Sequence, residues 1–439
     1  MFKRHFKETI LLALPMIVGQ IGQLSMSIAD NVMVGRVGTD ALAAAAIGNA
    51  LFMLVMVVGF GISMAITPLT AMAAGARRDT DCGVILRQGL IVNLLSGVLL
   101  CVVTLVGAES IRFFHQPETI VEPAILYMQV LGFSMLPLML FQSFRQFAEG
   151  VSFLKPAMVI TLLANLVNIA VNWIFIYGNL GAPALGVIGA GLATFFSRTF
   201  MALSLMWVIM TAPSLKRFDP SLRYRKIDIL LMKTLLKIGI PGACQYFFEV
   251  SAFTASAVIV GWMGTQALAA HQIALNLASI SFMVAMGIAG AGTIRVSHAL
   301  GRDSARDVRT AGFSAVLLCA GFMATSGLVF VLFRESLPMF YVSDMEVTKM
   351  AASLLVIVAF FQISDGTQSV GLGILRGITD MKIPTLITLT AYWVIGLPSG
   401  YVLAFHFDLG IYGVWYGLLI GLTASALLMM LRFNVKTKK

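Results

Sequence analysis

The chain has 439 residues, of which 59% are hydrophobic and 11% charged, and its mean hydropathy is +0.92. Soluble domains carry about 25% charged residues, so this composition excludes an ordinary soluble protein and indicates an integral membrane protein. The net charge of +10 does not predict a nucleic-acid partner, because the basic residues are concentrated in alternate loops between apolar segments.

Apolar stretches of roughly 20 residues or more, without alternating polarity, predict transmembrane helices rather than barrel strands. We therefore predict an all-α integral membrane protein with twelve transmembrane helices. The first apolar run is too long for a cleavable signal and lacks an A-x-A site, so it is expected to remain as the first helix. The predicted spans are 11–34, 47–72, 84–107, 123–144, 157–178, 186–211, 230–260, 268–294, 311–333, 348–373, 384–405 and 410–431.

The placement of Lys and Arg predicts the orientation of the chain in the membrane. One set of alternate loops holds most of these residues, and the opposite set has Arg36, Arg112, Arg334 and Lys349. Because basic loops are cytoplasmic in membrane proteins, both termini are predicted to be cytoplasmic. The basic loops include Lys3, Arg4, Lys7, Arg77, Arg78, the cluster at 216–226 and the tail at 436–439.

The first part of each half repeats at a constant offset, which is the separation between Pro15 and Pro241 and is called the repeat offset below. GRVGTDALAAAA, which begins at Gly35, recurs in this register as GWMGTQALAAHQ, which begins at Gly261. Further on the register drifts by a few residues, and Gly186 and Gly189 recur as Gly410 and Gly413. Each half has six predicted helices, an even number, so both halves enter the membrane in the same orientation and form a parallel repeat of two six-helix bundles. We expect an N-terminal lobe at 1–212, a cytoplasmic linker at 213–229 and a C-terminal lobe at 230–439.

Three acidic side chains, Asp30, Glu249 and Asp365, lie well inside apolar runs. A carboxylate at mid-membrane costs about 3 kcal/mol, so such residues typically face a cavity and take part in function. Two carboxylates in one dehydrated cavity repel each other unless a cation lies between them, so Glu249 and Asp365 suit a proton, a sodium ion or an organic cation. The alternative for each is a hydrogen-bonded residue that joins helices and binds no cargo.

Polar residues accompany Asp30 in the first half. Asn165, Asn168 and Asn172 are spaced three or four apart and share one helix face, and Thr194 lies in the next predicted helix. Amide and hydroxyl oxygens are hard ligands for a small cation. An inert ladder of hydrogen bonds between helices explains the same spacing.

Aromatic residues lie near the two carboxylates of the second half. Phe361 lies one turn before Asp365 and Tyr246 precedes Glu249, so their rings are candidates for a pocket that binds flat cations. For any single aromatic residue, a lipid-facing or core position is the alternative. The sequence has no Walker loop, H-E-x-x-H or G-x-S-x-G motif, so we expect neither an enzyme nor a cofactor.

Stretches from both halves carry a family resemblance: LALPMIVGQIGQLSMSIADNVMVGRVG, QYFFEVSAF, AAHQIALNLASISFMVAMGIAGAGTIRVSHALG and SDGTQSVGLGILRG. With them the sequence resembles the multidrug and toxic compound extrusion (MATE) transporters, in particular their NorM-type bacterial branch, over nearly the whole chain. The resemblance implies a cation site, with Na+ as a candidate metal ion, at Glu249 and Asp365. It also implies a second polar cluster, which is formed by Asp30, Asn168, Asn172 and Thr194.

The chain departs from this family pattern at two positions. Some relatives have an Asp where this chain has Asn172, which removes a charge from the first-half cluster. Some have a Tyr where this chain has Phe361, which removes a hydroxyl ligand one turn before Asp365.

The resemblance implies a secondary antiporter that exports cationic amphipathic compounds in exchange for inward Na+ or H+. Residue types do not distinguish the two ions, since a carboxylate pair serves either. Acidic groups among apolar and aromatic walls favour a broad range of monovalent aromatic cations. The protein is expected to be a monomer in the bacterial cytoplasmic (inner) membrane, with membrane lipid around it and small-molecule cationic drugs as its partners.

A lipid-linked precursor flippase of the same superfamily is the alternative function. Flippases tend to carry several cationic residues inside the central cavity to bind pyrophosphate. The interior charges of this chain are acidic, and Arg198 is the only Arg well within the predicted spans. The antiporter is therefore the preferred hypothesis.

Overall fold

The computed structural model describes residues 2–114, 117–223 and 227–438, so residues 224–226 of the predicted linker and the terminal Lys439 lie outside the described residues. Within the described ranges the chain forms helices and short connections without a strand, as the all-α prediction requires. The α-helices are α1 (Phe2–Gly35), α2 (Thr39–Ser63), α3 (Ile66–Gly75), α4 (Asp79–Ala108), α5 (Glu118–Phe133), α6 (Met135–Gly150), α7 (Lys155–Tyr177), α8 (Val187–Thr211), α9 (Ile229–Gly261), α10 (Thr265–Gly301), α11 (Ala305–Leu332), α12 (Ser336–Met339), α13 (Met345–Gly377), α14 (Lys382–Leu389), α15 (Leu397–Phe405) and α16 (Ile411–Thr437). Short 3-10 segments are η1 (Glu109–Phe114), η2 (Asn179–Gly181) and η3 (Pro213–Phe218), and a π-helix, η4 (Thr390–Gly396), joins α14 to α15.

The described helices form twelve candidate membrane spans, which confirms the predicted number. Some spans consist of consecutive elements: α2 with α3, α4 with η1, α5 with α6, and α14 with η4 and α15. Large apolar side chains cover outward faces, as on α4, where Leu95, Leu99 and Val106 are exposed. Lipid tails solvate such faces, whereas water would not.

The chain divides into two compact units that do not coincide with the two halves of the sequence. The N-unit consists of Val18–Ala243, and the C-unit consists of Met1–Ile17 together with Cys244–Lys439. The divisions fall inside α1 and α9, shortly after Pro15 and Pro241. Each half therefore contributes the beginning of its first helix to the unit formed mainly by the other half. The lobes predicted at 1–212 and 230–439 follow the linker instead and remain a prediction.

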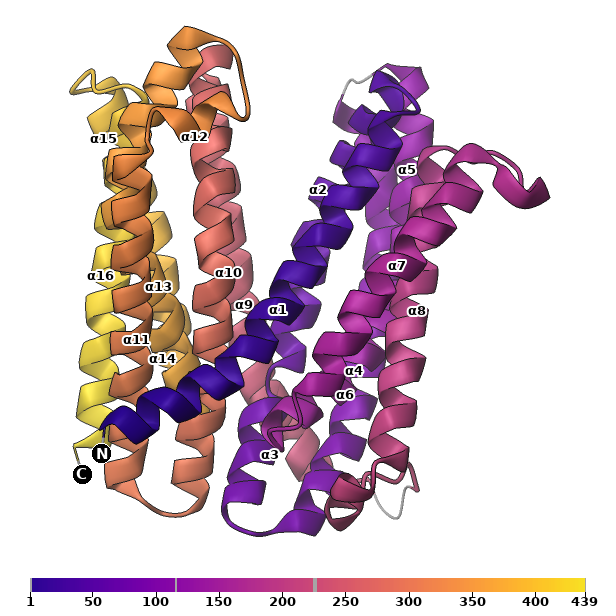
Figure 1. The fold of residues 1–439 in the computed structure, drawn as a ribbon, viewed down its shortest axis with the longest axis vertical. Helices are drawn as coiled ribbons and strands as arrows, with labels where there is room; N and C mark the ends of the chain where they lie inside the picture. The colour runs from indigo at the N-terminus through magenta and orange to yellow at the C-terminus, as the bar shows by residue number, and fades with distance from the viewer. Residues whose placement is uncertain (1, 115–116, 224–226, 439) are drawn as a thin grey trace. The chain divides into compact units, whose positions relative to one another are not determined.

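Helix α13 is the centre of the C-unit, where it packs against α10, α11 and α16 (Figure 1). Its first turn is capped by Asp344, whose carboxylate accepts hydrogen bonds from the N–H groups of Glu346 at 2.8 Å and Val347 at 3.3 Å. Such a cap satisfies backbone donors that a helix leaves unpaired. Because neighbouring helices surround α13, a polar residue on it, such as Asp365, is held inside the bundle.

In the N-unit, α7 packs against α8, and α6 packs against α4 and α8. Phe141, Phe144 and Phe147 recur every three residues along α6 and are all fully buried. This spacing places the three rings along one stripe of the helix, which faces the core of the unit.

Equivalent glycines in the two halves adopt equivalent backbone conformations. Gly38 and Gly264, with φ of 156° and 112°, precede α2 and α10. Gly186 and Gly410, with φ of 53° and 54°, precede α8 and α16. A residue with a Cβ is strained at such positive φ values, so these glycines carry the sequence repeat into the backbone.

Two further glycines of the repeat allow helices to approach closely. A Cβ on Gly61 would lie 2.3 Å from Cα of Ala243, inside the N-unit, and a Cβ on Gly287 would lie 2.4 Å from Cγ1 of Ile17, inside the C-unit. The beginning of α9 therefore packs on α2, and the beginning of α1 packs on α10. The two contacts are equivalent, since the repeat offset relates Gly61 to Gly287 and Ile17 to Ala243.

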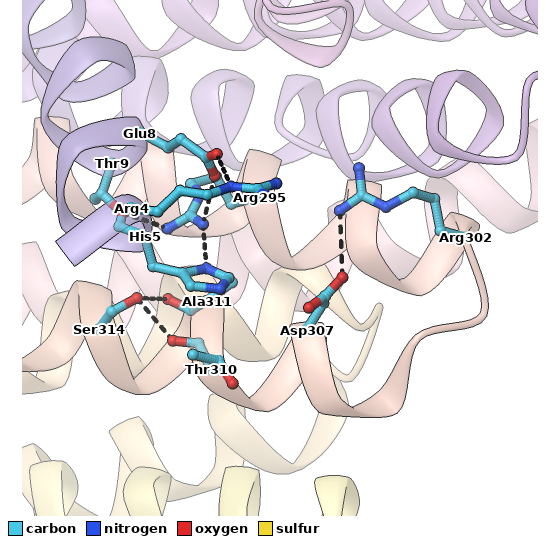
Figure 2. A network of polar contacts seen from close by, with 10 residues as sticks. All are labelled: Arg4, His5, Glu8, Thr9, Arg295, Arg302, Asp307, Thr310, Ala311 and Ser314. Atoms are coloured by element: carbon cyan, nitrogen blue, oxygen red, sulfur yellow. Dashed lines mark hydrogen bonds and ion pairs between the residues drawn. The ribbon is translucent and has the colours of Figure 1, made fainter. Parts of the chain in front are cut away.

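Polar contacts fasten the beginning of α1 to α10 in the C-unit (Figure 2). Arg295 of α10, which is 8% exposed, donates to the carbonyl oxygen of His5 at 2.8 Å and to Oγ1 of Thr9 at 2.6 Å. It also contacts Nδ1 of His5 at 2.5 Å and pairs with Glu8 at 3.0 Å. Arg4 pairs with Glu8 as well, at 2.8 Å. We call this set of five residues the α1 clamp.

Candidate functional site

Glu249 on α9 and Asp365 on α13 both lie buried in the C-unit, with 9% and 7% of their surfaces exposed. Glu249 accepts a hydrogen bond at 3.2 Å from Nε2 of Gln245, one turn earlier on the same helix. The fold brings the two carboxylates close enough to interact electrostatically. Two acidic groups of the second half, far apart in sequence, thus form one cluster.

Asp365 differs from the other buried acids in its lack of partners. The buried Glu149 pairs with Arg145 at 2.9 Å, and the half-buried Asp380 pairs with Arg432 at 2.8 Å. Asp365 accepts no hydrogen bond and forms no ion pair within the described part of the chain, where its electrostatic neighbour is Glu249. Burial of an unpaired carboxylate is costly, so its oxygens are available to a cationic ligand.

The sequence analysis did not single out three polar residues of this cluster, Gln245, Gln368 and Tyr392. The Tyr392 hydroxyl donates to Oε1 of Gln368 at 2.9 Å and also interacts with Glu249. Spacing could have indicated Gln245, four residues before Glu249, and Gln368, three residues after Asp365, because these separations place side chains on one helix face. Tyr392 has no such signal, because it reaches the cluster from another helix.

The two aromatic residues predicted for a drug pocket are both engaged within the C-unit. Phe361 is 2% exposed and meets the ring of Trp415 edge-on at a centroid distance of 5.4 Å, so it packs in the core. Tyr246 is half-buried, and the guanidinium of Arg376 lies 5.7 Å from its ring centroid. Arg376 also interacts electrostatically with Glu249. A role of Phe361 and Tyr246 in drug binding stays a prediction.

The polar residues predicted around Asp30 come together in the N-unit from α1, α7 and α8. Asn172 donates to Asp30 at 2.6 Å and to Oδ1 of Asn168 at 3.1 Å, and Thr194 donates to Asp30 at 3.3 Å. Asn165, from the same face of α7, donates instead to a backbone carbonyl of α1 at 3.0 Å. Among the described residues, Nδ2 of Asn168 and Oδ1 of Asn172 are buried without a partner. This cluster therefore has spare polar atoms.

Arg198 brings a positive charge to the N-unit cluster. It lies one turn after Thr194 on α8, donates to Oγ of Ser134 at 2.6 Å and lies over the ring of Phe52 at 5.1 Å. It also interacts electrostatically with Asp30. The carboxylate of the N-unit cluster thus has a cationic side chain of the protein nearby, which reduces its demand for a bound cation.

The C-unit cluster has the stronger demand for a cation. It combines two carboxyl groups with one neighbouring guanidinium, that of Arg376, so acidic groups outnumber basic ones in this cluster. Oε1 of Gln245 is buried without a described partner, next to Glu249. Carboxylate and amide oxygens are the ligands that hard monovalent and divalent cations prefer. Glu249, Asp365 and Gln245 can therefore hold a small cation or the charged group of an organic one.

Sequence comparisons relate the chain to known proteins over nearly its whole length. A profile of the MatE family matches residues 15–174 and 241–402, so its two matches begin at Pro15 and Pro241, the pair that defines the repeat offset. The multidrug resistance protein MdtK of Yersinia enterocolitica is 36% identical over 433 residues, which are 98% of this chain and 95% of the relative. The probable multidrug resistance protein NorM of Mesorhizobium japonicum is 35% identical over 440 residues, which are 99% of this chain and 94% of the relative.

The fold is also similar to solved structures. An outward-facing multidrug resistance MATE family transporter of the MOP superfamily superimposes with a TM-score of 0.90 at 22% identity, and the match covers 99% of this chain and 97% of that one. A eukaryotic MATE transporter superimposes with a TM-score of 0.89 at 20% identity, over 100% of this chain and 99% of that one. At these identities the structures establish the arrangement of helices.

Proposed function

Since the chain belongs to the MATE family of membrane transporters, we propose that it is a multidrug efflux antiporter that exports cationic amphipathic compounds in exchange for inward Na+ or H+. Relatives that match nearly its full length are named multidrug resistance proteins, which supports drug efflux. The protein acts as a transporter and not as an enzyme, and small molecules are its cargo.

The observation that carries the cation preference is the unpaired Asp365 beside Glu249. A cationic drug or a coupling ion provides the counter-charge that the described part of the chain does not provide to Asp365. An anionic compound would add a further negative charge to the same cluster, so anions are expected to be poor substrates.

Competition between ion and drug for Glu249 and Asp365 couples the two movements. Inward movement of one positive charge across 100 mV releases ~2.3 kcal/mol, which is worth roughly a fifty-fold drug gradient at one-to-one coupling. This energy drives export only if ion binding lowers drug affinity, and a shared carboxylate site couples them directly, because the bound ion neutralises the drug's partner.

The flippase alternative has less support. A pyrophosphate group calls for several free cationic side chains in one cavity. Only two guanidinium groups lie near the clusters in the described part of the chain: Arg198 donates to Ser134 and lies over Phe52, and Arg376 lies over the ring of Tyr246 and beside Glu249. In the C-unit cluster acidic groups outnumber basic ones.

The protein resides in the bacterial inner membrane as a multi-pass protein with both termini in the cytoplasm, which the basic alternate loops support. We also propose that it acts as a monomer.

Transport in proteoliposomes tests this function. Purified protein is reconstituted, and the movement of ethidium is followed under an imposed Na+ gradient at constant pH and, separately, under a pH gradient without Na+. Uphill ethidium transport driven by one of these gradients is expected, and the effective gradient identifies the coupling ion. If neither gradient moves ethidium, or if an anionic dye is preferred, the proposed function is wrong.

A further inference from the structure

Tyr392 occupies an unusual piece of backbone in the C-unit. It lies on η4, a seven-residue π-helix, and it is fully buried. The indole N–H of the next residue, Trp393, donates to the carbonyl oxygen of Phe248 at 3.1 Å, which fastens the π-helix to α9 directly before Glu249. π-Helical turns are rare and concentrate at functional sites, so the position of this side chain calls for an explanation.

Close packing fixes the π-helix from its other side. A Cβ on Gly421 of α16 would lie 2.5 Å from the carbonyl oxygen of Ala391, so this contact admits no larger residue. The ring of Tyr392 also meets that of Phe253 on α9 at a centroid distance of 5.8 Å. The hydroxyl of Tyr392 is therefore held in place between α9 and α13.

This hydroxyl has two possible acceptors but a single hydrogen. It donates to Oε1 of Gln368 at 2.9 Å, and Glu249 is its second neighbour. In this arrangement Nε2 of Gln368 is buried without an acceptor among the described residues. A half-turn of the amide would present Nε2 to the tyrosine oxygen, which would then direct its hydrogen to Glu249.

In this second arrangement Nε2 of Gln368 donates to the tyrosine oxygen, and the tyrosine hydroxyl donates to Glu249. The chain of hydrogen bonds runs from Gln368 through Tyr392 to Glu249, which also keeps the bond from Gln245. The first arrangement, in which Tyr392 donates to Gln368, leaves more of the Glu249 carboxylate free for a ligand. The two arrangements differ in one amide rotation and one hydroxyl rotation and need no movement of a helix.

We infer that Tyr392 and Gln368 form a switchable hydrogen-bond donor that competes with cations for Glu249. When a cation binds Glu249, Tyr392 donates to Gln368; when the cation leaves, Gln368 turns and Tyr392 donates to Glu249. Tyr392 is thus a positioning residue that stabilises the empty site and promotes cation release. The inference rests on the proposed function, because it takes Glu249 as part of the cation site.

The charged neighbours of Glu249 do not take part in this exchange. They are Asp365 and Arg376, both on α13, and neither side chain has to move for the exchange. The switch depends on where one hydroxyl hydrogen points and requires no change in the protonation of any residue.

Equilibrium binding of ethidium to purified protein, at fixed pH and salt, tests the switch because substitutions at its two ends have opposite effects. Tyr392→Phe removes the competing donor, so we expect ethidium to bind about tenfold more tightly, while its maximal efflux rate falls. Gln368→Met removes the acceptor that receives the hydroxyl in the bound state, so we expect binding to weaken by about tenfold. In the double variant the effect of Gln368→Met should disappear, because the hydroxyl that it acts on is absent.

A matched control and a reference variant separate the possible failures. Tyr401→Phe alters an exposed tyrosine of the same span and should leave binding unchanged. Glu249→Gln should weaken ethidium binding; if it does not, or if the wild-type protein does not bind ethidium, the proposed cation site is wrong and the inference falls with it. If Glu249→Gln weakens binding but Tyr392→Phe and Gln368→Met shift it in the same direction or not at all, the switch alone is wrong.

Discussion

Asp365 is a buried carboxylate that lacks both a hydrogen-bond donor and a cationic partner among the described residues. Buried polar groups in proteins are nearly always paired, so the exceptions concentrate at functional sites. The pairs of Arg145 with Glu149 and Arg432 with Asp380 illustrate the usual arrangement. An unpaired buried acid lowers the stability of the folded bundle, and a bound cation restores that stability by pairing with the acid.

Replacing each of the two carboxylates by the corresponding amide should impair ion-coupled transport without unfolding the protein. Glu249→Gln and Asp365→Asn should each leave the protein inserted and folded, because an amide is easier to bury than a charge. We expect ion-driven uphill ethidium efflux in proteoliposomes to fall at least about tenfold in each variant, since one unit of opposite charge at the site is lost. Gel filtration and thermal melting would verify the fold.

Glu335→Gln is the matched control, because Glu335 is an exposed acid whose substitution removes the same charge from the surface. Efflux by this variant should equal that of the wild type. If both site variants still drive uphill efflux at nearly wild-type rates, coupling resides elsewhere, and the Asp30 cluster becomes the candidate.

The residues of the candidate site were predictable from the sequence where cost or spacing marked them. Asp30, Glu249 and Asp365 could be found because a carboxylate in an apolar run is expensive. The guanidinium over Tyr246 and the hydroxyl of Tyr392 could not be found, since they approach from other helices and depend on how those helices pack. Whether the predicted residues bind ion and drug stays a prediction.

Among the helices, the beginnings of α1 and α9 are equivalent in the repeat, and the α1 clamp makes them different. Arg295, His5 and Thr9 hold the beginning of α1 in the C-unit by buried polar contacts. The positions that the repeat offset relates to these three are Leu69, Leu231 and Leu235, which are all apolar. Polar contacts exchange readily with water and lipid headgroups, whereas apolar ones do not, so the beginning of α1 is expected to be the more easily released of the two.

Substitution of Arg295 tests this difference. In Arg295→Met the amides of residues 4–14 should exchange hydrogen about tenfold faster than in the wild type, because several hydrogen bonds to a charged group are lost. The beginning of α9, residues 229–243, belongs to the N-unit and should exchange as before. Arg295→Lys, which keeps the charge, should show a smaller effect, and unchanged exchange at residues 4–14 in Arg295→Met would contradict a clamp.

The number and order of spans were predictable, but their internal breaks were not. Apolar length alone located twelve spans, because the cost of exposing a backbone polar group to lipid enforces continuous helix. The division between α2 and α3 and the π-helical turn of η4 each lie within a continuous apolar run. Apolar length therefore did not indicate either break, since both arise from packing. The predicted first span, 11–34, also began late, because the polar residues that lengthen α1 are those of the clamp.

At the scale of the whole molecule, the sequence repeat predicted two halves, whereas the contacts define two units that exchange helix beginnings. The repeat offset could reveal which positions are equivalent. It could not reveal which unit a helix beginning joins, because the same pairs of residues match in either arrangement. The N-unit therefore needs residues 229–243 of the second half, and the C-unit needs Met1–Ile17 of the first.

Separate expression of the halves tests this exchange. A cut in the linker after residue 222 produces two fragments, and each lacks a helix beginning that its main unit needs. We expect each fragment alone to be degraded, and the two fragments expressed together to copurify and to restore ethidium efflux. If either fragment alone accumulates as a folded, protease-resistant protein, the exchange does not matter for stability.

The exchange has the form of a domain swap, and this constrains how such a chain can have arisen. In the present protein the beginning of α9, which includes Ala243, packs on Gly61 of α2. A half-length protein with the same sequence pattern would leave Gly61 uncovered unless a second copy supplied the beginning of its first helix. Two copies would have satisfied each other in this way, as an obligate homodimer. Gene fusion would then have made the dimer permanent and freed the copies to diverge, so that the two swapped segments now differ, with one polar at His5 and Thr9 and the other apolar at the equivalent positions.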